Sequence, residues 1–256
     1  MTLLATKKLT KTFGGLTAVS NVDMQVNSGE ILGIIGPNGA GKTTFFNLIS
    51  GLYQPTTGEI LFKDKKVDGY KGHQMAKAGI ARTFQNIRLL ANLTVLDNVL
   101  VGSFTRGTAG LWGAILRGKR VKEEEKRVRQ ESMDQLELVG LQDYANQLAG
   151  ILSYGQQRKL EIARALAIYP ALLLLDEPTA GMNAEEVEEI MKLVRYMKTQ
   201  DKTIVLIEHN MHLVMNLCER IIVFDHGVKV AQGTPEEIQV NPLVIEAYLG
   251  KEAEDE

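Results

Sequence analysis

Cysteine and tryptophan are almost missing from this chain of 256 residues, which holds one of each. Because Cys218 is the only cysteine, no disulfide can form within the chain, as is typical of proteins from a reducing compartment. We therefore expect Cys218 to be a small, buried apolar residue. Long apolar runs are missing too: none approaches the roughly 18 residues that cross a bilayer, and residues 1–8 lack the apolar segment of a signal peptide. Any role at a membrane is expected to be peripheral.

An excess of charge of either sign is also missing. The chain has 29 Lys and Arg against 31 Asp and Glu, which leaves a net charge of −2 at pH 7. Because no global basic field results, we expect no nucleic-acid partner. The apolar fraction of 45% and the charged fraction of 23% are ordinary for a soluble globular protein. The length suits one large α/β domain, or such a core with a subdomain.

A glycine-rich loop is the strongest motif, because Gly36-Pro37-Asn38-Gly39-Ala40-Gly41-Lys42-Thr43-Thr44 matches the pattern G-x-x-x-x-G-K-[ST] at every fixed position. An apolar run at 31–35 leads into it, and a helix predicted over 43–51 follows. In this setting, the backbone N–H groups of the loop and of the helix start can bind phosphate. Lys42 can reach the outer phosphates, and the Thr43 hydroxyl can bind Mg²⁺. The pattern predicts a site for a nucleoside triphosphate rather than a glycine-rich turn without a ligand.

A second helix start has the same physical character. The segment Leu152-Ser153-Tyr154-Gly155-Gln156-Gln157 opens a helix that is predicted to end at Pro170. Ser153 and Gly155 lie at its N-terminus, where free backbone N–H groups can bind an anion. A plain helix cap at Ser153 would have the same pattern, so both interpretations stay open.

Two acidic residues follow the continuous apolar run at 172–175, which is typical of a strand buried on both faces of a parallel sheet. Because successive strand side chains point in opposite directions, Asp176 and Glu177 cannot have the same role. One can hold the shell of a Mg²⁺ ion while the other faces an attacking water. The alternative is a structural acid pair, which is costly without a cation or donors nearby. His209 follows the next buried strand, predicted over 203–207, and leaves the same type of strand end.

Two further residues have open roles. Gln85 ends a short strand predicted over 80–85, where its amide could coordinate a metal or water, or simply lie in solvent. Phe13 precedes the turn at Gly14-Gly15, and it is either a packed aromatic or a flat face for a purine ring. The remaining histidines are most simply surface residues: His73, His212 and His226.

The composition changes near residue 89, and from there to about residue 148 the pattern is helical. We interpret this region as a helical subdomain inserted into the sheet domain, with a long charged helix over 121–139. The segment around Trp112 has an apolar stripe with basic flanks. It could lie against a membrane or a partner helix, but packing within the subdomain is the interpretation we favour.

With the phosphate loop, residues 152–157 and residues 172–177 in this order, the chain resembles the ATP-binding-cassette ATPases over nearly its whole length. The resemblance implies an α/β fold: a phosphate-loop NTPase (RecA-like) sheet core with an antiparallel β subdomain and an inserted α-helical subdomain. It implies one ATPase domain with a nucleotide-binding core at 1–88 and 158–250. The helical subdomain at 89–157 would carry the signature motif, and an acidic tail would follow at 251–256.

The same resemblance implies ATP and Mg²⁺ as cofactors. The metal would be held by Thr43, Gln85 and, through water, Asp176. Catalysis would involve Glu177 as general base, with His209, Lys42 and Gln85 around the γ-phosphate. The residues implied to bind nucleotide are Phe13, Asn38, Gly39, Ala40, Gly41, Lys42, Thr43 and Thr44, with Ser153, Gly155 and Gln156 acting on ATP held by a second subunit.

Two positions depart from the family pattern. Tyr154 stands where the signature usually has a glycine, and Asn183 stands where an aspartate is common. Neither change removes a phosphate ligand or the base. The Phe-Gly-Gly start, Arg-Thr-Phe-Gln, Leu-Ser-Tyr-Gly-Gln-Gln-Arg and Gly-Thr-Pro-Glu-Glu-Ile look like the importer subfamily for branched-chain amino acids.

Urea or amide importers and a lipopolysaccharide-export ATPase share several of these features. The implied partners are a second ATPase subunit, either a copy or a sister chain, and two transmembrane permease subunits. A solute-binding protein would act indirectly. The implied location is the cytoplasmic face of the cell membrane. The rival class is a non-transport regulator of the same family, but this chain has one cassette and no charged linker.

Overall fold

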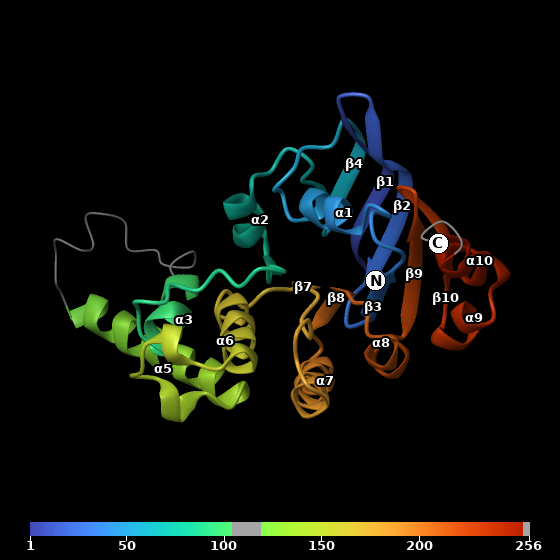
Figure 1. Ribbon diagram of the computed structural model, residues 1–256. Coiled ribbons are helices and arrows are strands. Elements are labelled where there is room, and N and C mark those ends of the chain that lie inside the picture. Colours follow the sequence, from blue (N-terminus) through green and yellow to red (C-terminus); the bar gives the residue numbers. More distant parts are fainter. Residues whose placement is uncertain (104–118, 253–256) are drawn as a thin grey trace.

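The computed structural model describes residues 1–103 and 119–252 (Figure 1). The segment around Trp112 and residues 253–256 of the expected acidic tail lie outside the described residues. The strands are β1 (Thr2–Phe13), β2 (Leu16–Asn27), β3 (Ile31–Ile35), β4 (Thr57–Phe62), β5 (Lys65–Lys66), β6 (Ile80–Arg82), β7 (Leu172–Asp176), β8 (Thr203–Ile207), β9 (Arg220–Asp225) and β10 (Val228–Gly233). The α-helices are α1 (Lys42–Ile49), α2 (Gly72–Ala78), α3 (Val95–Ser103), α5 (Lys119–Leu138), α6 (Tyr154–Leu166), α7 (Ala184–Thr199), α8 (Met211–Leu217), α9 (Pro235–Gln239) and α10 (Pro242–Glu252).

One sheet is antiparallel and has the strand order β2-β1-β4-β5. Its two long strands, β1 and β2, form a hairpin around the turn at Gly14-Gly15. The hairpin pairs the two strands from Thr2–Asn27 to Phe13–Leu16. This sheet is the antiparallel β subdomain that the sequence predicts.

The second sheet has the order β10-β9-β3-β8-β7-β6, and all its neighbours pair in parallel except β10 at the edge. The carboxyl ends of parallel strands meet at one edge of a sheet, where ligands bind in open α/β folds. The phosphate loop follows β3, Asp176 ends β7, and the segment that leads to His209 follows β8, so all three lie at that edge. The strand predicted over 80–85 ends at Arg82, so Gln85 lies in the connection that follows it.

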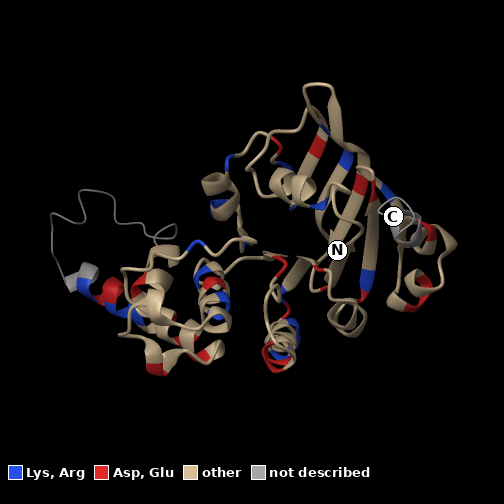
Figure 2. Ribbon diagram, viewed as in Figure 1, with Lys and Arg blue, Asp and Glu red and all other residues tan. Residues whose placement is uncertain are grey.

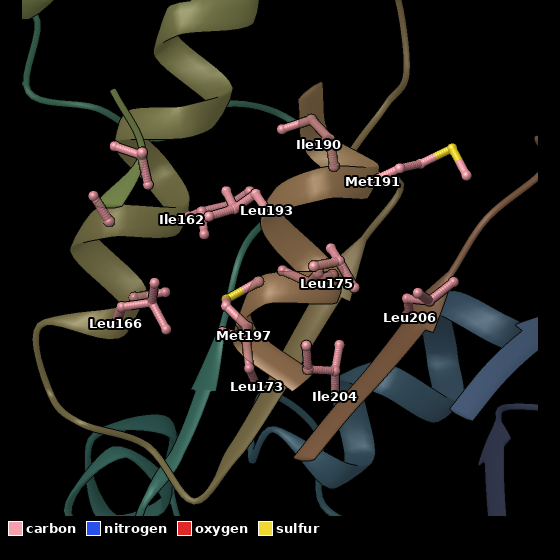
Figure 3. Close-up of a cluster of buried hydrophobic side chains, with 14 of the residues drawn as sticks. Ile162, Leu166, Leu173, Leu175, Ile190, Met191, Leu193, Met197, Ile204 and Leu206 are labelled. Atoms are coloured by element: carbon pink, nitrogen blue, oxygen red, sulfur yellow. The ribbon is translucent and has the colours of Figure 1, made fainter. Parts of the chain in front are cut away.

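Strands β3, β7 and β8 are apolar throughout because both faces of the central sheet are covered. Leu173 and Leu175 of β7 belong to the cluster formed with α6 and α7, and Figure 3 shows these side chains beside Met197 and Ile204. Leu172 and Leu174 belong to a second cluster, formed with α1 and the antiparallel sheet. Each fully buried leucine stabilises the fold by about 1.5–3 kcal/mol. The strand that carries Asp176 is therefore held firmly from both sides.

Helices α3, α5 and α6 gather at one end of the molecule, and α9 and α10 lie at the opposite end (Figure 1). Helices α5, α6 and α7 carry charged residues of both signs (Figure 2), and in α7 the acidic residues precede the basic ones. Helix α6 is continuous across the expected subdomain boundary between residues 157 and 158. The start of α6 and its buried second half therefore belong to one continuous helix.

Several local predictions are confirmed. Cys218 is buried behind β3, and burial raises the pKa of its thiol to about 12. The other predicted surface histidines are exposed: His73, His212 and His226. Among the described helices, none is long and apolar enough to cross a membrane.

Candidate active site

The phosphate loop has a backbone path that only glycine allows at two of its positions. Gly36 has φ +145°, and a Cβ there would lie 2.0 Å from the carbonyl oxygen of Phe224. Gly41 has φ +94°, and a Cβ there would lie 2.3 Å from the carbonyl oxygen of Ala18. Both glycines therefore allow the loop to pack against neighbouring backbone as well as to curl. This close packing fixes the loop before any ligand arrives.

Lys42 begins α1 directly after the loop, and its side chain folds back into it. The ammonium group donates to the carbonyl oxygens of Gly36 (2.6 Å) and Pro37 (2.8 Å). No side chain caps the N-terminus of α1, so its first N–H groups point toward the loop with their partial positive charge. Thr43 lies in the first turn of this helix and is exposed. Binding of negatively charged phosphate oxygens by these groups stays a prediction.

Glu177 lies between two other predicted site residues. Its Oε2 accepts a hydrogen bond from the Gln85 side-chain amide at 3.0 Å, and its Oε1 lies 3.1 Å from His209 Nε2. The Glu177 backbone has φ +46°, a left-handed conformation that costs a residue with a side chain about 1–3 kcal/mol. Such strain is typical of functional positions, where the surrounding structure over-determines the backbone. The sheet edge thus brings together three residues that are far apart in the sequence.

Asp176 faces a different environment, as the alternation along a strand predicts. Its Oδ2 accepts from the Arg82 guanidinium at 2.7 Å in a buried ion pair. Arg82 also donates to Asn47 Oδ1 (2.7 Å) and Ser50 Oγ (2.8 Å) at the end of α1. The Asp176 Oδ1 atom is buried and has no hydrogen-bond partner within the described part of the chain. A buried carboxylate oxygen without a donor is costly, and a cation or a bound water would satisfy it.

Ser153 and Gln156 form a capping box at the start of α6. The Gln156 N–H donates to Ser153 Oγ at 3.3 Å, and the Ser153 N–H donates to Gln156 Oε1 at 3.0 Å. The cap interpretation is therefore confirmed, and the possible role of this segment toward an anion stays a prediction. Tyr154 is the first residue of the helix and is not among the residues with positive φ. Its backbone is unstrained although the family usually has a glycine here.

Asn183, the other departure from the family pattern, also caps a helix. Its side-chain oxygen accepts from the Glu186 N–H at 3.0 Å, and the Asn183 N–H donates to the Glu186 carboxylate. Asparagine and aspartate are about equally good at this position of a helix. The substitution therefore leaves the start of α7 intact.

Phe13 has features of both roles considered for it. Its ring packs edge-on against Tyr53 with the centroids 5.3 Å apart, and Lys11 Nζ lies 5.0 Å from the ring centroid. The residue is still 41% exposed, which leaves ring surface open to a ligand. Tyr53 was not singled out from the sequence, because an aromatic residue in a loop gives no local signal of such a pair.

Two buried charged residues of the site also escape analysis of the sequence alone. Arg82 joins the end of α1 to Asp176, as described above. Glu208 accepts from the N–H (2.9 Å) and hydroxyl (2.6 Å) of Thr179 and from the N–H of His209. It therefore ties the segment after Glu177 to the segment that carries His209. The available signal was a charged residue directly at the end of an apolar strand.

Comparison with known proteins identifies the family. Residues 19–180 match the family model described as "ABC transporter", and residues 228–254 match the model described as "Branched-chain amino acid ATP-binding cassette transporter". The chain is 44% identical over 250 residues to the high-affinity branched-chain amino acid transport ATP-binding protein LivG of Escherichia coli K12. That alignment covers 97% of this chain and 98% of LivG.

Solved structures agree with this assignment. The ADP conformation of MJ1267, an ATP-binding cassette of an ABC transporter, superimposes with a TM-score of 0.85 at 33% identity, covering 98% of this chain and 99% of that one. The dimeric structure of MJ0796, a bacterial ABC transporter cassette, has a TM-score of 0.78 at 29% identity, covering 91% and 99%. The fold predicted from the sequence is thereby confirmed. The chain belongs to the ABC transporter family, and it is an ATP-hydrolysing cassette of that family.

Proposed function

We propose that this chain is the ATP-hydrolysing subunit of an importer for branched-chain amino acids. The observation that carries the proposal is the match of residues 228–254 to a model of that transporter class. Strand β10 and helices α9 and α10, which form this segment, contain none of the predicted catalytic residues. A match there is not accounted for by ATP hydrolysis alone, so it favours one transporter class over the others considered.

ATP would bind with its phosphates against the loop amides and Lys42, and with its base near Phe13. The ammonium group of Lys42 would exchange the carbonyl oxygens of Gly36 and Pro37 for the outer phosphates, a charge-assisted interaction that is stronger than the bonds it replaces. The backbone N–H groups at the start of α1 would add partial positive charge to the same place. These contacts would hold the transferred phosphoryl group in one orientation.

The donor set at this edge fits Mg²⁺, which prefers hydroxyl, amide and carboxylate oxygens and keeps several waters. Thr43 and Gln85 would offer such oxygens, and Asp176 has a buried oxygen without a partner among the described residues. When bound, the metal would neutralise charge that develops on the phosphate oxygens. No cluster of three or more His, Cys, Asp or Glu that could hold a metal occurs in the described part of the chain, so the site would depend on the nucleotide for further ligands.

Glu177 would act as the general base that orients and polarises the attacking water. Its carboxylate is partly exposed at the sheet edge and already accepts from Gln85, so its position is preorganised. His209 lies 3.1 Å from the other carboxylate oxygen and would contact the γ-phosphate side of the site. A base held in place by two neighbours needs little reorganisation when the reaction begins.

A second cassette would complete the site. Ser153, Gly155 and Gln156 lie at the start of α6 and would bind the phosphates of ATP held by that neighbour, with the N–H groups of Ser153 and Gln156 exchanging their capping-box partners for phosphate oxygens. The dimeric structure known for MJ0796 supports an arrangement of paired cassettes. The neighbour would be either a copy of this chain or a sister chain, since both would present the same motif.

The permease subunits would dock in a groove between α2, β6, α3 and α6. Apolar side chains dominate its walls, and the residues that line it include Leu52, Ala76, Ile80, Phe84, Val101 and Ile168. A short helix with an apolar face would fit such a surface. Phe84 lines the groove and precedes Gln85, so a movement of the bound permease helix would be transmitted through Phe84 to Gln85 at the catalytic edge. This partnership would place the chain at the cytoplasmic face of the membrane, bound peripherally.

The test is reconstitution. The chain is co-expressed and co-purified with two candidate permease subunits and assembled in liposomes with a candidate solute-binding protein for branched-chain amino acids. We expect ATP-dependent uptake of radiolabelled leucine, and no uptake with the Glu177→Gln variant. Uptake of urea without leucine would overturn the branched-chain assignment, and a chain that co-purifies with ribosomes instead of membrane proteins would overturn the transporter assignment.

A further inference from the structure

Tyr154 stands where the signature of the family usually has a glycine, and its side chain contacts two other segments of the site. The ring packs against Gly181, where a Cβ would lie 3.3 Å from a ring carbon. The hydroxyl accepts a hydrogen bond from Arg158 Nη2 at 2.9 Å, and the guanidinium lies 5.4 Å from the ring centroid. A glycine at this position would make none of these contacts.

Arg158 connects Tyr154 to the residues near the catalytic edge. The residue is only 2% exposed, and its Nη1 donates to the carbonyl oxygen of Phe84 at 2.7 Å. Its Nη2 donates to the carbonyl oxygen of Gln85. One planar guanidinium therefore holds two successive carbonyl groups of the connection after β6. The side chain of Gln85 in turn donates to Glu177.

Glu161 lies one turn further along α6 and holds the same connection from the other side. Its Oε1 accepts from the Phe84 N–H at 3.3 Å, and its Oε2 lies 3.4 Å from Arg158 Nη1. Burial raises the pKa of this carboxyl group, although the Phe84 N–H and the Arg158 charge oppose the shift. The backbone before Gln85 is thus bonded through both its N–H and its C=O groups to one helix.

We propose that Tyr154 and Arg158 are positioning residues for ATP hydrolysis, which hold Gln85 against Glu177 and tie that contact to the start of α6. The inference rests on the roles proposed above for Gln85 and Glu177. The start of α6 carries Ser153 and Gly155, so a movement of this helix toward a second cassette carries the Gln85 carbonyl with it. Because Gly181 packs on the Tyr154 ring, the same movement of α6 would also displace the segment that contains Gly181.

A purely structural role predicts a different outcome. A buried arginine that serves only the fold lowers stability when it is replaced, and its effect on hydrolysis does not depend on Gln85. A positioning residue that acts through Gln85 loses its effect once the Gln85 side chain is gone. A double-mutant cycle therefore separates the two roles.

The experiment measures kcat and KM for ATP hydrolysis by the full-length chain. Arg158→Lys keeps the charge but cannot bridge both carbonyl groups, and we expect kcat to fall about tenfold with KM changed less than about twofold. Tyr154→Phe removes only the hydroxyl of a partly exposed residue, so this variant should fold as the wild type does. We expect its kcat to fall about threefold. In a Gln85→Ala background, each substitution should change kcat by less than about twofold.

Lys159→Gln is the matched control, because Lys159 is the next residue on the helix and pairs with Glu189 instead. It should leave kcat and KM unchanged. Equal losses for Arg158→Lys in both backgrounds, or a rise in KM at unchanged kcat, would overturn the inference while leaving the proposed function intact. If Gln85→Ala alone left kcat unchanged, the proposed role of Gln85 would fail, and the two failures are thereby distinguished.

Discussion

The two halves of the active site are built on different physical grounds. The phosphate loop is a continuous stretch whose shape follows from glycine sterics at Gly36 and Gly41. The cluster of Gln85, Glu177 and His209 is made of side chains from three distant segments and is held by hydrogen bonds. The comparison teaches that the loop can be recognised from its own residues. The cluster exists only because the parallel sheet brings its strand ends to one edge.

The largest effect is expected where the loop touches neighbouring backbone. Gly36→Ala would place a Cβ 2.0 Å from the Phe224 carbonyl oxygen, so either the loop or β9 must move. We expect the free energy of unfolding to fall by about 4 kcal/mol and ATP binding to be lost. Urea unfolding and equilibrium binding of a fluorescent ATP analogue measure the two effects.

Gly140→Ala is the control for that experiment. Gly140 also has a positive φ, +71°, but a Cβ there would meet no atom within 4 Å. The variant should lose only about 1 kcal/mol of stability and keep its affinity for nucleotide. If Gly36→Ala behaved in the same way, close packing would not be what shapes the loop.

The second prediction concerns Arg82, which joins the end of α1 to Asp176, the residue before Glu177. Arg82→Gln would leave the buried Asp176 carboxylate without its ionic partner and release the end of α1. Breaking a buried pair in this way costs about 3 kcal/mol or more in unfolding free energy. Arg127→Gln breaks an exposed pair with Glu131 and should cost no more than about 0.5 kcal/mol in urea unfolding. Equal costs would mean that burial does not set the strength of the Arg82 pair.

The residues proposed to carry out the chemistry have clearer signals in the sequence than the residues that support them. Lys42, Asp176 and Glu177 each follow a buried strand or a glycine-rich turn, and both patterns are local. The supporting role of Arg82 and Glu208 could not be predicted, because each depends on a partner that the sheet order brings near. The same limit applies to Tyr154, whose contacts with Gly181 and Arg158 cross from one segment to another.

The fold was also predicted unevenly. The apolar runs before the loop and before Asp176 identify central strands, because both faces of a parallel sheet are buried. The strand over 80–85 was predicted too long, since β6 pairs with β7 only as far as Arg82 and Leu174. The chain beyond Arg82 is held by Arg158 and Glu161 of α6 instead of by a strand. Local propensity cannot distinguish these two ways of holding an extended segment.

The third prediction addresses the cluster directly. Glu177→Gln keeps the hydrogen bond from Gln85 within reach but removes the base, so hydrolysis should slow at least about a hundredfold, or about 2.7 kcal/mol. ATP binding should persist, because the loop is unchanged. Glu188→Gln is the control, since this exposed glutamate pairs with His212 outside the cluster. Near-normal turnover by Glu177→Gln would remove Glu177 from its proposed role.

The smallest expected effect tests how tightly Cys218 packs against β3, the strand that leads into the phosphate loop. Cys218 lies against this strand, where a Cβ on Gly33 would come within 2.8 Å of its sulfur, and burial raises the pKa of the thiol from about 9 to about 12. Below pH 9 the thiol is protonated in both states, so its contribution to stability is fully present. Between pH 9 and pH 12 the unfolded chain releases the proton and the folded chain keeps it, so stability falls as pH rises.

The unfolding free energy of the wild type should fall by about 1 kcal/mol more than that of Cys218→Ala between pH 9 and pH 10. Both proteins contain the same lysines and tyrosines, so the effects of these residues cancel in the comparison. If the difference in unfolding free energy did not change with pH, water would reach the thiol and the strand that leads into the loop would not be tightly packed.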